Sequence, residues 1–358
     1  MVHAKAPRSG PRSGFVLVTT TVCMIGLLTL VGLATDLGRV QVARNELQVF
    51  ADEAAMAASF ELDGTMVGLS NARAVAAAGP GSGVTTNHWY FGTQTVAGAT
   101  VTFATSPNGP FDPNPASPLG YRFVQVQVNG TVQLYFLPIL PGIPGWQNVS
   151  ASGVAGQSQL DSLGDGLAPF SPDAHSDTDP NFGFSAGQLY TLRWAPPGKR
   201  GKTSGSCPGD IGYNPGSSAD RGYIDVGQGN GDAGLRDAIV NNTYSLSLPL
   251  EVGTTLDEVS GQKSVTTAVN ERYAQDSDLS ALNFGSYHGN GRRLYTVAVN
   301  DGGSPGRVLG FALFFLQPSP CGSDNTTPCC AEYVGAAVLG STKRGAGTAG
   351  LYTVQLVR

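Results

Sequence analysis

The sequence predicts an α+β protein in which a long N-terminal helix precedes β-rich parts. An apolar run, Phe15 to Thr35, passes without a turn signal into a helical stripe that reaches Asp63-Gly64. Segments with alternating apolar and polar residues follow, and the clearest is residues 122–128, RFVQVQV. Glycine and proline number 49 and 23 among the 358 residues, a composition typical of many short strands joined by turns.

The run from Phe15 to Thr35 has the length and composition of a membrane-spanning helix. About 21 residues rising ~1.5 Å each cover roughly 30 Å, the hydrocarbon thickness of a bilayer. The run contains neither a charged residue nor a proline, and the stub before it, residues 1–14, is basic. By the positive-inside rule this stub is cytoplasmic. We expect a single-pass, membrane-tethered protein whose part beyond the span lies outside the cytoplasm.

A cleavable secretory signal is the alternative to an uncleaved anchor. Leu33-Ala34 followed by Thr35 offers a cleavage site, although the apolar core of a signal usually has only ~7–15 residues. Cleavage would produce a secreted soluble binding protein or hydrolase. A glycan- or calcium-binding adhesin module is a further alternative. The N-terminal residue of the mature protein separates the anchored form from the secreted one.

The helix is predicted to continue beyond the membrane to about Leu62. Apolar residues recur there at steps of three and four, with polar residues on the opposite face. Alanine-rich faces let helices pack closely, so this stripe is expected to contact partner subunits. Its members are Leu37, Val40, Leu47, Ala51, Ala54 and Ala58. Asp36, directly after the span, is expected to be a solvated charge at the membrane surface.

Several short motifs follow one another along this helix. They are Asp-Leu-Gly-Arg at 36–39, Ala-Arg-Asn-Glu-Leu-Gln at 43–48, Ala-Asp-Glu-Ala-Ala-Met-Ala-Ala at 51–58 and Glu-Leu-Asp-Gly at 61–64. The segment resembles the N-terminal part of the TadE/TadG-like family of Flp (Tad) pilus-assembly proteins. The matching motif residues are Asp36, Gly38, Gln48 and Asp52. The resemblance covers residues 10–65 closely and continues more weakly to Gln159.

The resemblance implies an inner-membrane protein of pseudopilin-like architecture that supports assembly of an adhesive pilus. We therefore predict a non-enzymatic, membrane-anchored protein of pilus assembly or of an envelope surface structure. Its partners would be the bilayer and other pilus-assembly or envelope proteins. Larger members of the family can carry a metal motif, Asp-x-Ser-x-Ser. The nearest string here, residues 276–280, has Asp278 where serine is expected, so we expect no such site.

The part after the membrane divides into two predicted domains. Residues 36–159 combine the long helix with a second helix, 65–78, and with an antiparallel sheet. The expected strands lie at 89–91, 95–103, 121–128 and 149–156. Residues 160–183, rich in serine, aspartate and proline, are predicted to be a linker.

The second domain, residues 184–358, is predicted to be β-rich. Its expected strands lie at 188–194, 293–299, 307–316, 332–339 and 351–357, and together they would form one sheet or a small barrel. Residues of about 209–290 differ in texture, with helices expected at 234–241 and 263–273. We interpret them as an insertion that could present a surface for a ligand.

Residue patterns for catalysis and for cofactors are weak. Charged residues make up 13% of the chain with a net charge of −5, whereas a nucleic-acid-binding protein would show basic stripes. The glycine loop at 227–234 imitates a dinucleotide-binding turn but lacks the surrounding parallel βαβ pattern, so we predict no cofactor. The four histidines are scattered and no nucleophile-elbow motif occurs, so we predict no catalytic residues and no enzyme.

One acidic segment contains weak candidates for a metal site. Its oxygen-bearing side chains are Asp173, Asp177, Asp179 and Asn181. Phe182 occupies the turn position where a calcium loop needs glycine, and no glutamate follows at the twelfth position. We therefore expect a solvated acidic segment without a bound metal.

The five cysteines fall into two groups. Cys23 lies within the predicted span and is expected to be a free thiol. The exported cysteines, Cys207, Cys321, Cys329 and Cys330, allow three pairings. A bond between neighbouring cysteines strains the peptide, so we favour Cys207 with one of the adjacent pair and Cys321 with the other, each bridge stabilising by ~2–4 kcal/mol. Cys207–Cys321 with a vicinal bond, and a metal site, are the alternatives.

Overall fold

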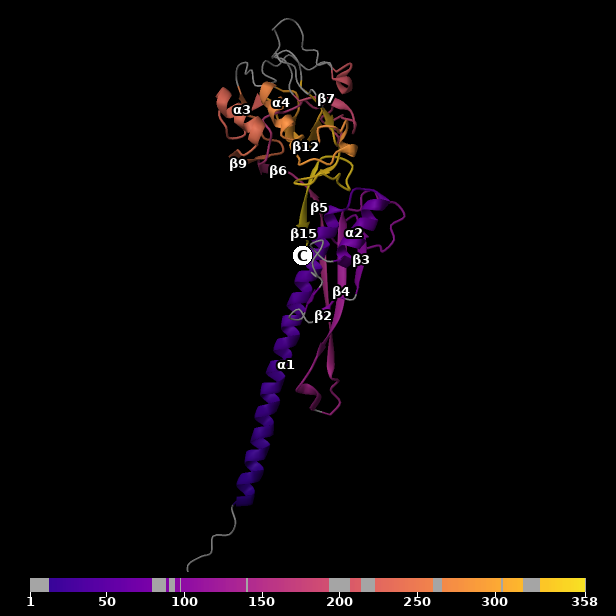
Figure 1. Cartoon of the computed structure of the whole chain (residues 1–358), viewed down its shortest axis with the longest axis vertical. Coiled ribbons are helices and arrows are strands. Elements are labelled where there is room, and N and C mark those ends of the chain that lie inside the picture. The colour runs from indigo at the N-terminus through magenta and orange to yellow at the C-terminus, as the bar shows by residue number, and fades with distance from the viewer. Residues whose placement is uncertain are drawn as a thin grey trace, which may run out of the picture. The chain divides into compact units, whose positions relative to one another are not determined.

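The computed structural model describes residues 13–78, 88–89, 94–96, 98–139, 141–192, 207–213, 223–259, 266–303, 305–317 and 329–357. The fold is α+β, with the long N-terminal helix followed by several sheets, as predicted (Figure 1). The chain forms two compact units. Unit 1 comprises Met1–Ala54, Ala76–Val101 and Val126–Gly153, and unit 2 comprises Ala55–Val75, Thr102–Gln125 and Val154–Arg358. Each unit is described by itself below.

Helix α1 (Ser13–Phe60) is continuous over 48 residues, which confirms the predicted extension beyond the apolar run. Its threonines bond back to the helix: the hydroxyl of Thr20, for example, donates to the carbonyl oxygen of Val16 at 2.8 Å. Within unit 2, the buried amide of Gln157 donates to the carbonyl oxygens of Ser59 and Leu62, which satisfies groups that the end of the helix leaves open.

Helix α2 (Met66–Ala78) also lies where the sequence predicted it. Asp63 accepts the backbone N–H and the hydroxyl of Thr65, and the Thr65 hydroxyl in turn accepts the N–H of Gly68. A threonine that accepts an N–H three residues ahead is a helix N-cap.

The first sheet has five strands in the order β14-β15-β5-β4-β3. Their bounds are β3 (Ala99–Ala104), β4 (Phe123–Gln133), β5 (Trp146–Gln159), β14 (Ala337–Val338) and β15 (Leu351–Leu356). In β4 the valines Val124, Val126 and Val128 are buried while Gln127 is exposed, so the predicted alternation is confirmed. A separate pair, β1 (His88–Trp89) and β2 (Gln94–Thr95), is antiparallel.

The second sheet has four strands, all in unit 2, in the order β11-β12-β13-β7. Their bounds are β7 (Leu189–Thr191), β11 (Leu294–Asn300), β12 (Val308–Leu316) and β13 (Cys330–Tyr333). Two short pairs accompany this sheet, β6 (Ser162–Asp165) with β9 (Ser245–Glu251), and β8 (Tyr223–Ile224) with β10 (Glu258–Val259). Helices α3 (Asp232–Asn241) and α4 (Thr266–Ala274) and the 3-10 turns η1 (Leu137–Ile139), η2 (Pro208–Asp210) and η3 (Phe284–Ser286) complete the described elements.

The last strand differs from the expectation of a single C-terminal sheet. β15 pairs antiparallel with β5, Tyr352 opposite Gln159, and therefore belongs to the first sheet. The segment predicted as one strand at 332–339 is divided into β13 and β14, with Gly335 between them at φ +87°. Strand propensity does not reveal which sheet edge a strand will join, because that choice depends on contacts distant in the sequence.

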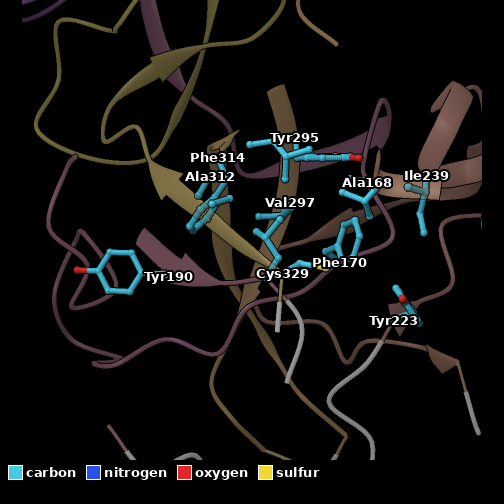
Figure 2. Packing of buried hydrophobic residues seen from close by; sticks show 14 of the residues in the cluster. Ala168, Phe170, Tyr190, Tyr223, Ile239, Tyr295, Val297, Ala312, Phe314 and Cys329 are labelled. Carbon is cyan, nitrogen blue, oxygen red and sulfur yellow. The ribbon is translucent and has the colours of Figure 1, made fainter. Parts of the chain in front are cut away.

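The core of unit 2 is rich in aromatic residues (Figure 2). The rings of Phe170 and Tyr295 meet edge to face with centroids 5.5 Å apart. Phe170 comes from the segment predicted as a linker, and Tyr223 and Ile239 come from the predicted insertion, yet all three are buried in this cluster. Residues 160–183 and 209–290 therefore contribute to the core, which differs from the expectation of a solvated linker and a separate insertion.

Candidate functional site: the hairpin latch on helix α1

The first half of α1 exposes its apolar side chains. Leu17 and Leu30, for example, are 69% and 64% exposed, and the other large apolar side chains between Phe15 and Leu33 are exposed as well. In the described part of the chain, this is the helix that is long and apolar enough to cross a membrane. An exposed apolar helix of this length indicates a membrane-anchored protein.

The second half of α1 buries the predicted stripe. Val40, Leu47, Ala51 and the alanines at 54 and 58 are buried, and only Leu37, at 49%, is exposed. Within unit 1 the cover comes from β5: a Cβ at Gly153 would lie 2.5 Å from the carbonyl oxygen of Ala51. This differs from the expectation that the stripe contacts partner subunits, because its buried members are packed within the chain, with β5 beside Ala51.

Asp36 is buried, and its carboxylate binds backbone N–H groups of the connection between β4 and β5. Oδ1 accepts the N–H of Tyr135 at 3.1 Å, and Oδ2 accepts those of Phe136 and Leu137 at 2.9 and 2.8 Å. We call Asp36 the latch and residues 134–146 the hairpin tip. The prediction of a solvated charge at position 36 is wrong, because three backbone donors replace water around the carboxylate.

The ionised form of Asp36 is favoured by this arrangement. Burial acts to raise the pKa of the carboxyl, but the N–H groups of Leu137, Tyr135 and Phe136, helped by the charge of Arg39, outweigh it and hold the pKa below its ordinary value. The Arg39 guanidinium lies 4.1 Å from the centroid of the Tyr135 ring. Asp36 and Arg39, three residues apart on the helix, thus both engage the hairpin tip.

Two other motif residues hold the same hairpin farther along the helix. The amide of Gln48 donates to the carbonyl oxygen of Ser152 in β5 at 2.9 Å and to Oδ1 of Asp52 at 2.8 Å. Asp52 therefore orients the amide that grips β5. Gly38 is different, since a Cβ there would meet no atom within 4 Å. Asp36, Gln48 and Asp52 together fasten the β4–β5 hairpin to α1 within unit 1.

The hairpin tip packs against the apolar half of the helix, beside α1 in Figure 1. A Cβ at Gly32 would lie 2.5 Å from the Cβ of Phe136, so glycine permits this close approach. A crevice of about 290 Å³ opens between helix and tip. Its lining residues are Ile25, Leu28, Thr29, Phe136, Leu137 and Ile139.

The sequence predicts a loop at residues 138–145, but it does not reveal that the hairpin tip contacts α1. The signal was present: residues 134–146 read LYFLPILPGIPGW, thirteen residues without a charged side chain between two strands that alternate polar and apolar residues. What the sequence alone could not supply is the pairing of this segment with Asp36, about 100 residues earlier in the chain.

One arrangement in unit 2 resembles catalytic machinery. His175 lies 2.9 Å from Asp210, whose other oxygen accepts the hydroxyl of Thr191 at 2.7 Å. The carboxylate stands between the imidazole and the hydroxyl, whereas a nucleophile needs the imidazole next to the hydroxyl. Tyr213 stacks on the imidazole at 3.9 Å. This geometry suits structural cross-linking of the loops and not nucleophile activation.

The weak metal candidates do not come together as a ligand shell. Asp173 is buried, whereas Asp177 and Asp179 are exposed. Asp179 accepts the N–H of Asn181, whose side-chain oxygen accepts the hydroxyl of Tyr333. Among the residues that the structure describes, no group of three or more His, Cys, Asp or Glu side chains could hold a metal ion.

The string at 276–280 also has a structural use. Oδ1 of Asp278 accepts the hydroxyl and N–H of Ser280, and Oδ2 accepts the N–H of His288. These bonds, the one from His288 foremost, lower the pKa of Asp278 to about 2. Oδ2 of Asp276 accepts the hydroxyl of Tyr287 at 2.6 Å.

The disulfide arrangement agrees with the favoured pairing for one bridge. Cys207 is bonded to Cys330, and Cys329 is disulfide-bonded as well. Cys321 lies outside the described residues, so its predicted pairing stays a prediction. Cys23 is a free, exposed thiol in the apolar half of α1, as predicted.

Comparison with known proteins supports the resemblance for the N-terminal segment. Residues 14–78, which contain α2 and all but the first residue of α1, match the family described as Putative Flp pilus-assembly TadE/G-like. Searches of curated proteins and of solved structures found no match. The N-terminal segment, with its apolar helix and the motif residues that hold the hairpin, is therefore of the Tad type.

Proposed function

We propose that this protein is a non-enzymatic, membrane-anchored component of Flp-type pilus assembly. The observation that carries the proposal is the family match over residues 14–78, which covers the same helix that exposes an apolar half. In this proposal residues 15–35 span the inner membrane, the N-terminus is cytoplasmic, and residues beyond the span lie in the periplasm or outside the cell. The basic stub at residues 1–14 supports this orientation.

The proposed partners are other pilus-assembly or envelope proteins. Since the alanines of the stripe are buried within the chain, we assign the partner contact to the opposite face of α1, where Val42 and Val49 are exposed. These valines are seven residues apart, about two helical turns, so they share one face. The same proposal includes a surface for a ligand on residues 209–290, the segment that contains α3 and α4.

A deletion strain of the cell that encodes this chain tests the proposal. We expect the deletion to remove surface pili, the wild-type gene to restore them, and the double variant Val42→Asp, Val49→Asp to fail to restore them. A matched control is Leu248→Asp, an exposed apolar position in unit 2, which should restore pili. Unchanged pili in the deletion strain would contradict the proposal.

Determination of the mature N-terminus tests the anchored form against the secreted alternative. Cleavage after Ala34 would remove Gly32 and the crevice residues of α1, leaving the hairpin tip without its apolar support. We expect the mature membrane-bound protein to retain the segment before Ala34. Alkaline carbonate should fail to extract it, and release into the soluble fraction would favour the secreted form.

A further inference from the structure

The hairpin tip exposes apolar side chains and contains no charged ones. Ile139 is 77% exposed, and Tyr135, Phe136, Ile143 and Trp146 are also exposed or nearly so. Residues 134–146 contain no charged side chain. An exposed apolar patch of this kind marks a surface that some other apolar phase covers.

The position of the tip along α1 indicates that the lipid bilayer covers this apolar surface. The crevice places Ile139 beside Ile25, Leu28 and Thr29, all within the apolar run. Ile25 precedes Thr35 by ten residues, which corresponds to ~15 Å along a helix, about half of the ~30 Å hydrocarbon core. A helix that spans the bilayer over residues 15–35 therefore carries the tip into the half of the bilayer nearer Asp36.

The backbone of the tip is prepared for an environment without water. Lipid cannot hydrogen-bond to peptide groups, so exposed N–H groups are costly there. Asp36 accepts the N–H groups of residues 135–137, and Ile139 donates to the carbonyl oxygen of Phe136 at 3.1 Å. Pro138 has no N–H. From residue 135 to 139, each N–H is thus either bonded within the protein or missing.

The two ends of the tip have the residues typical of a membrane surface. Tyr135 and Trp146 stand at its entry and exit, and aromatic rings with a polar edge prefer the headgroup level. Arg39 stacks on Tyr135 and can reach lipid phosphates from there. Asp36, directly after the apolar run, also lies at the level of the membrane surface.

We propose that the hairpin tip, residues 134–146, inserts into the outer leaflet of the bilayer beside α1 and is held there by the backbone hydrogen bonds to Asp36. The occupant of its apolar face is lipid, with an acyl chain in the crevice beside Ile139. The inference rests on the proposed membrane anchoring by α1. The inserted tip is a second membrane contact of unit 1. With two contacts, unit 1 cannot rotate freely about the axis of α1.

Quenching of a fluorophore by lipids that carry a doxyl group tests the insertion in vesicles of the full-length protein. An environment-sensitive dye on Cys23 reports the anchor, since that thiol is free and lies in the span. The same dye on Ile139→Cys in a Cys23→Ala background reports the tip, and on Leu248→Cys, 79% exposed in unit 2, it reports water. We expect strong quenching at positions 23 and 139 and little at 248.

The outcomes separate the insertion from the anchoring. Quenching at Cys23 without quenching at Ile139→Cys would overturn the insertion while the anchor stands, and would assign the tip to a protein partner or to water. No quenching at either position would overturn both proposals. Quenching at both supports the insertion.

A second variant tests the role of the latch. Adding Asp36→Ala to the Ile139→Cys protein leaves three backbone N–H groups without their acceptor, so we expect quenching at position 139 to fall while the unfolding of unit 2 stays unchanged. The matched control is Glu53→Ala, which removes an exposed carboxylate from the same helix and does not belong to the residues that hold the hairpin. Equal quenching with and without Asp36 would overturn its role in holding the tip.

Discussion

Unit 1 and unit 2 each contain a buried charged side chain that is bound by backbone groups, Asp36 in unit 1 and Arg293 in unit 2. In unit 1, Asp36 accepts three N–H groups of the hairpin tip. In unit 2, the guanidinium of Arg293 donates to the carbonyl oxygens of Leu316, Asp278 and Ala281 at 2.9, 2.8 and 2.8 Å. Both residues are fully buried. Each charge therefore holds backbone groups in place. The anion in unit 1 binds N–H donors, and the cation in unit 2 binds carbonyl acceptors.

The surroundings of the two charges differ, and so do their consequences. Arg293 lies 4.2 Å from the centroid of the Phe315 ring, and its backbone N–H donates to buried Asp276. Around Asp36 the residues of the hairpin tip are largely exposed. We infer that Arg293, with buried surroundings, is required for the folding of unit 2. Asp36, beside exposed apolar residues, positions the hairpin tip. The predictions below test this difference.

The largest expected effect is that of Arg293→Ala. The substitution removes the donor to the carbonyl oxygens of Leu316, Asp278 and Ala281 and the cation that acts on buried Glu332, so we expect unit 2 to lose about 3–5 kcal/mol of unfolding free energy. Urea unfolding of the full chain in detergent, followed by near-UV circular dichroism, measures it. The hairpin tip should keep its lipid contact.

The matched control is Arg307→Ala. Arg307 is exposed and meets Asp301 at 3.5 Å at the surface, so its loss should cost less than ~1 kcal/mol. If Arg293→Ala unfolds at the same urea concentration as Arg307→Ala, the buried arginine does not stabilise unit 2 more than an exposed one.

The disulfide is the next largest contributor in unit 2. Cys330 lies in β13 opposite Thr191, and its bond to Cys207 closes 123 residues of chain. Because the bridge restricts the unfolded chain, we expect Cys330→Ser to lower the unfolding free energy by ~2–4 kcal/mol under oxidising conditions. Cys23→Ser, a free thiol in α1, should leave unit 2 unchanged, and an equal loss from both would contradict the assignment.

Local patterns predicted much of the fold. The apolar run and the stripe fixed α1, and alternation in RFVQVQV fixed the core of β4, since both depend on residues close in sequence. The sheet to which β15 belongs was not predictable in this way, because its pairing with β5 joins residues nearly 200 positions apart. Phe170 was missed as a core residue for the same reason, since its cover comes from Tyr295 and Tyr223.

The candidate site was predictable in part. The motif includes Asp36, Gln48 and Asp52, but the roles of Asp36 and Gln48 depend on hairpin residues that lie about 100 positions later in the chain. A charge directly after an apolar span reads as solvated by default, and only the tertiary structure supplies the three N–H groups that bury Asp36. The thirteen uncharged residues of the hairpin tip were the available signal.

The smallest expected effect is a pH dependence confined to the latch. The pKa of Asp36 is held below its ordinary value of 3.8, since the N–H groups of residues 135–137 and the charge of Arg39 outweigh the opposing effect of burial. A lowered carboxyl pKa stabilises the folded state above the ordinary pKa, and the contribution is lost as the pH falls through the folded value. Lipid quenching of the dye on Ile139→Cys should therefore be constant from pH 7 to about pH 5 and decrease only below the ordinary carboxyl pKa. Asp36→Asn cannot titrate, so in that background the quenching should not depend on pH. An identical decrease in Asp36→Asn would assign the effect to acid unfolding elsewhere and remove the latch from the comparison.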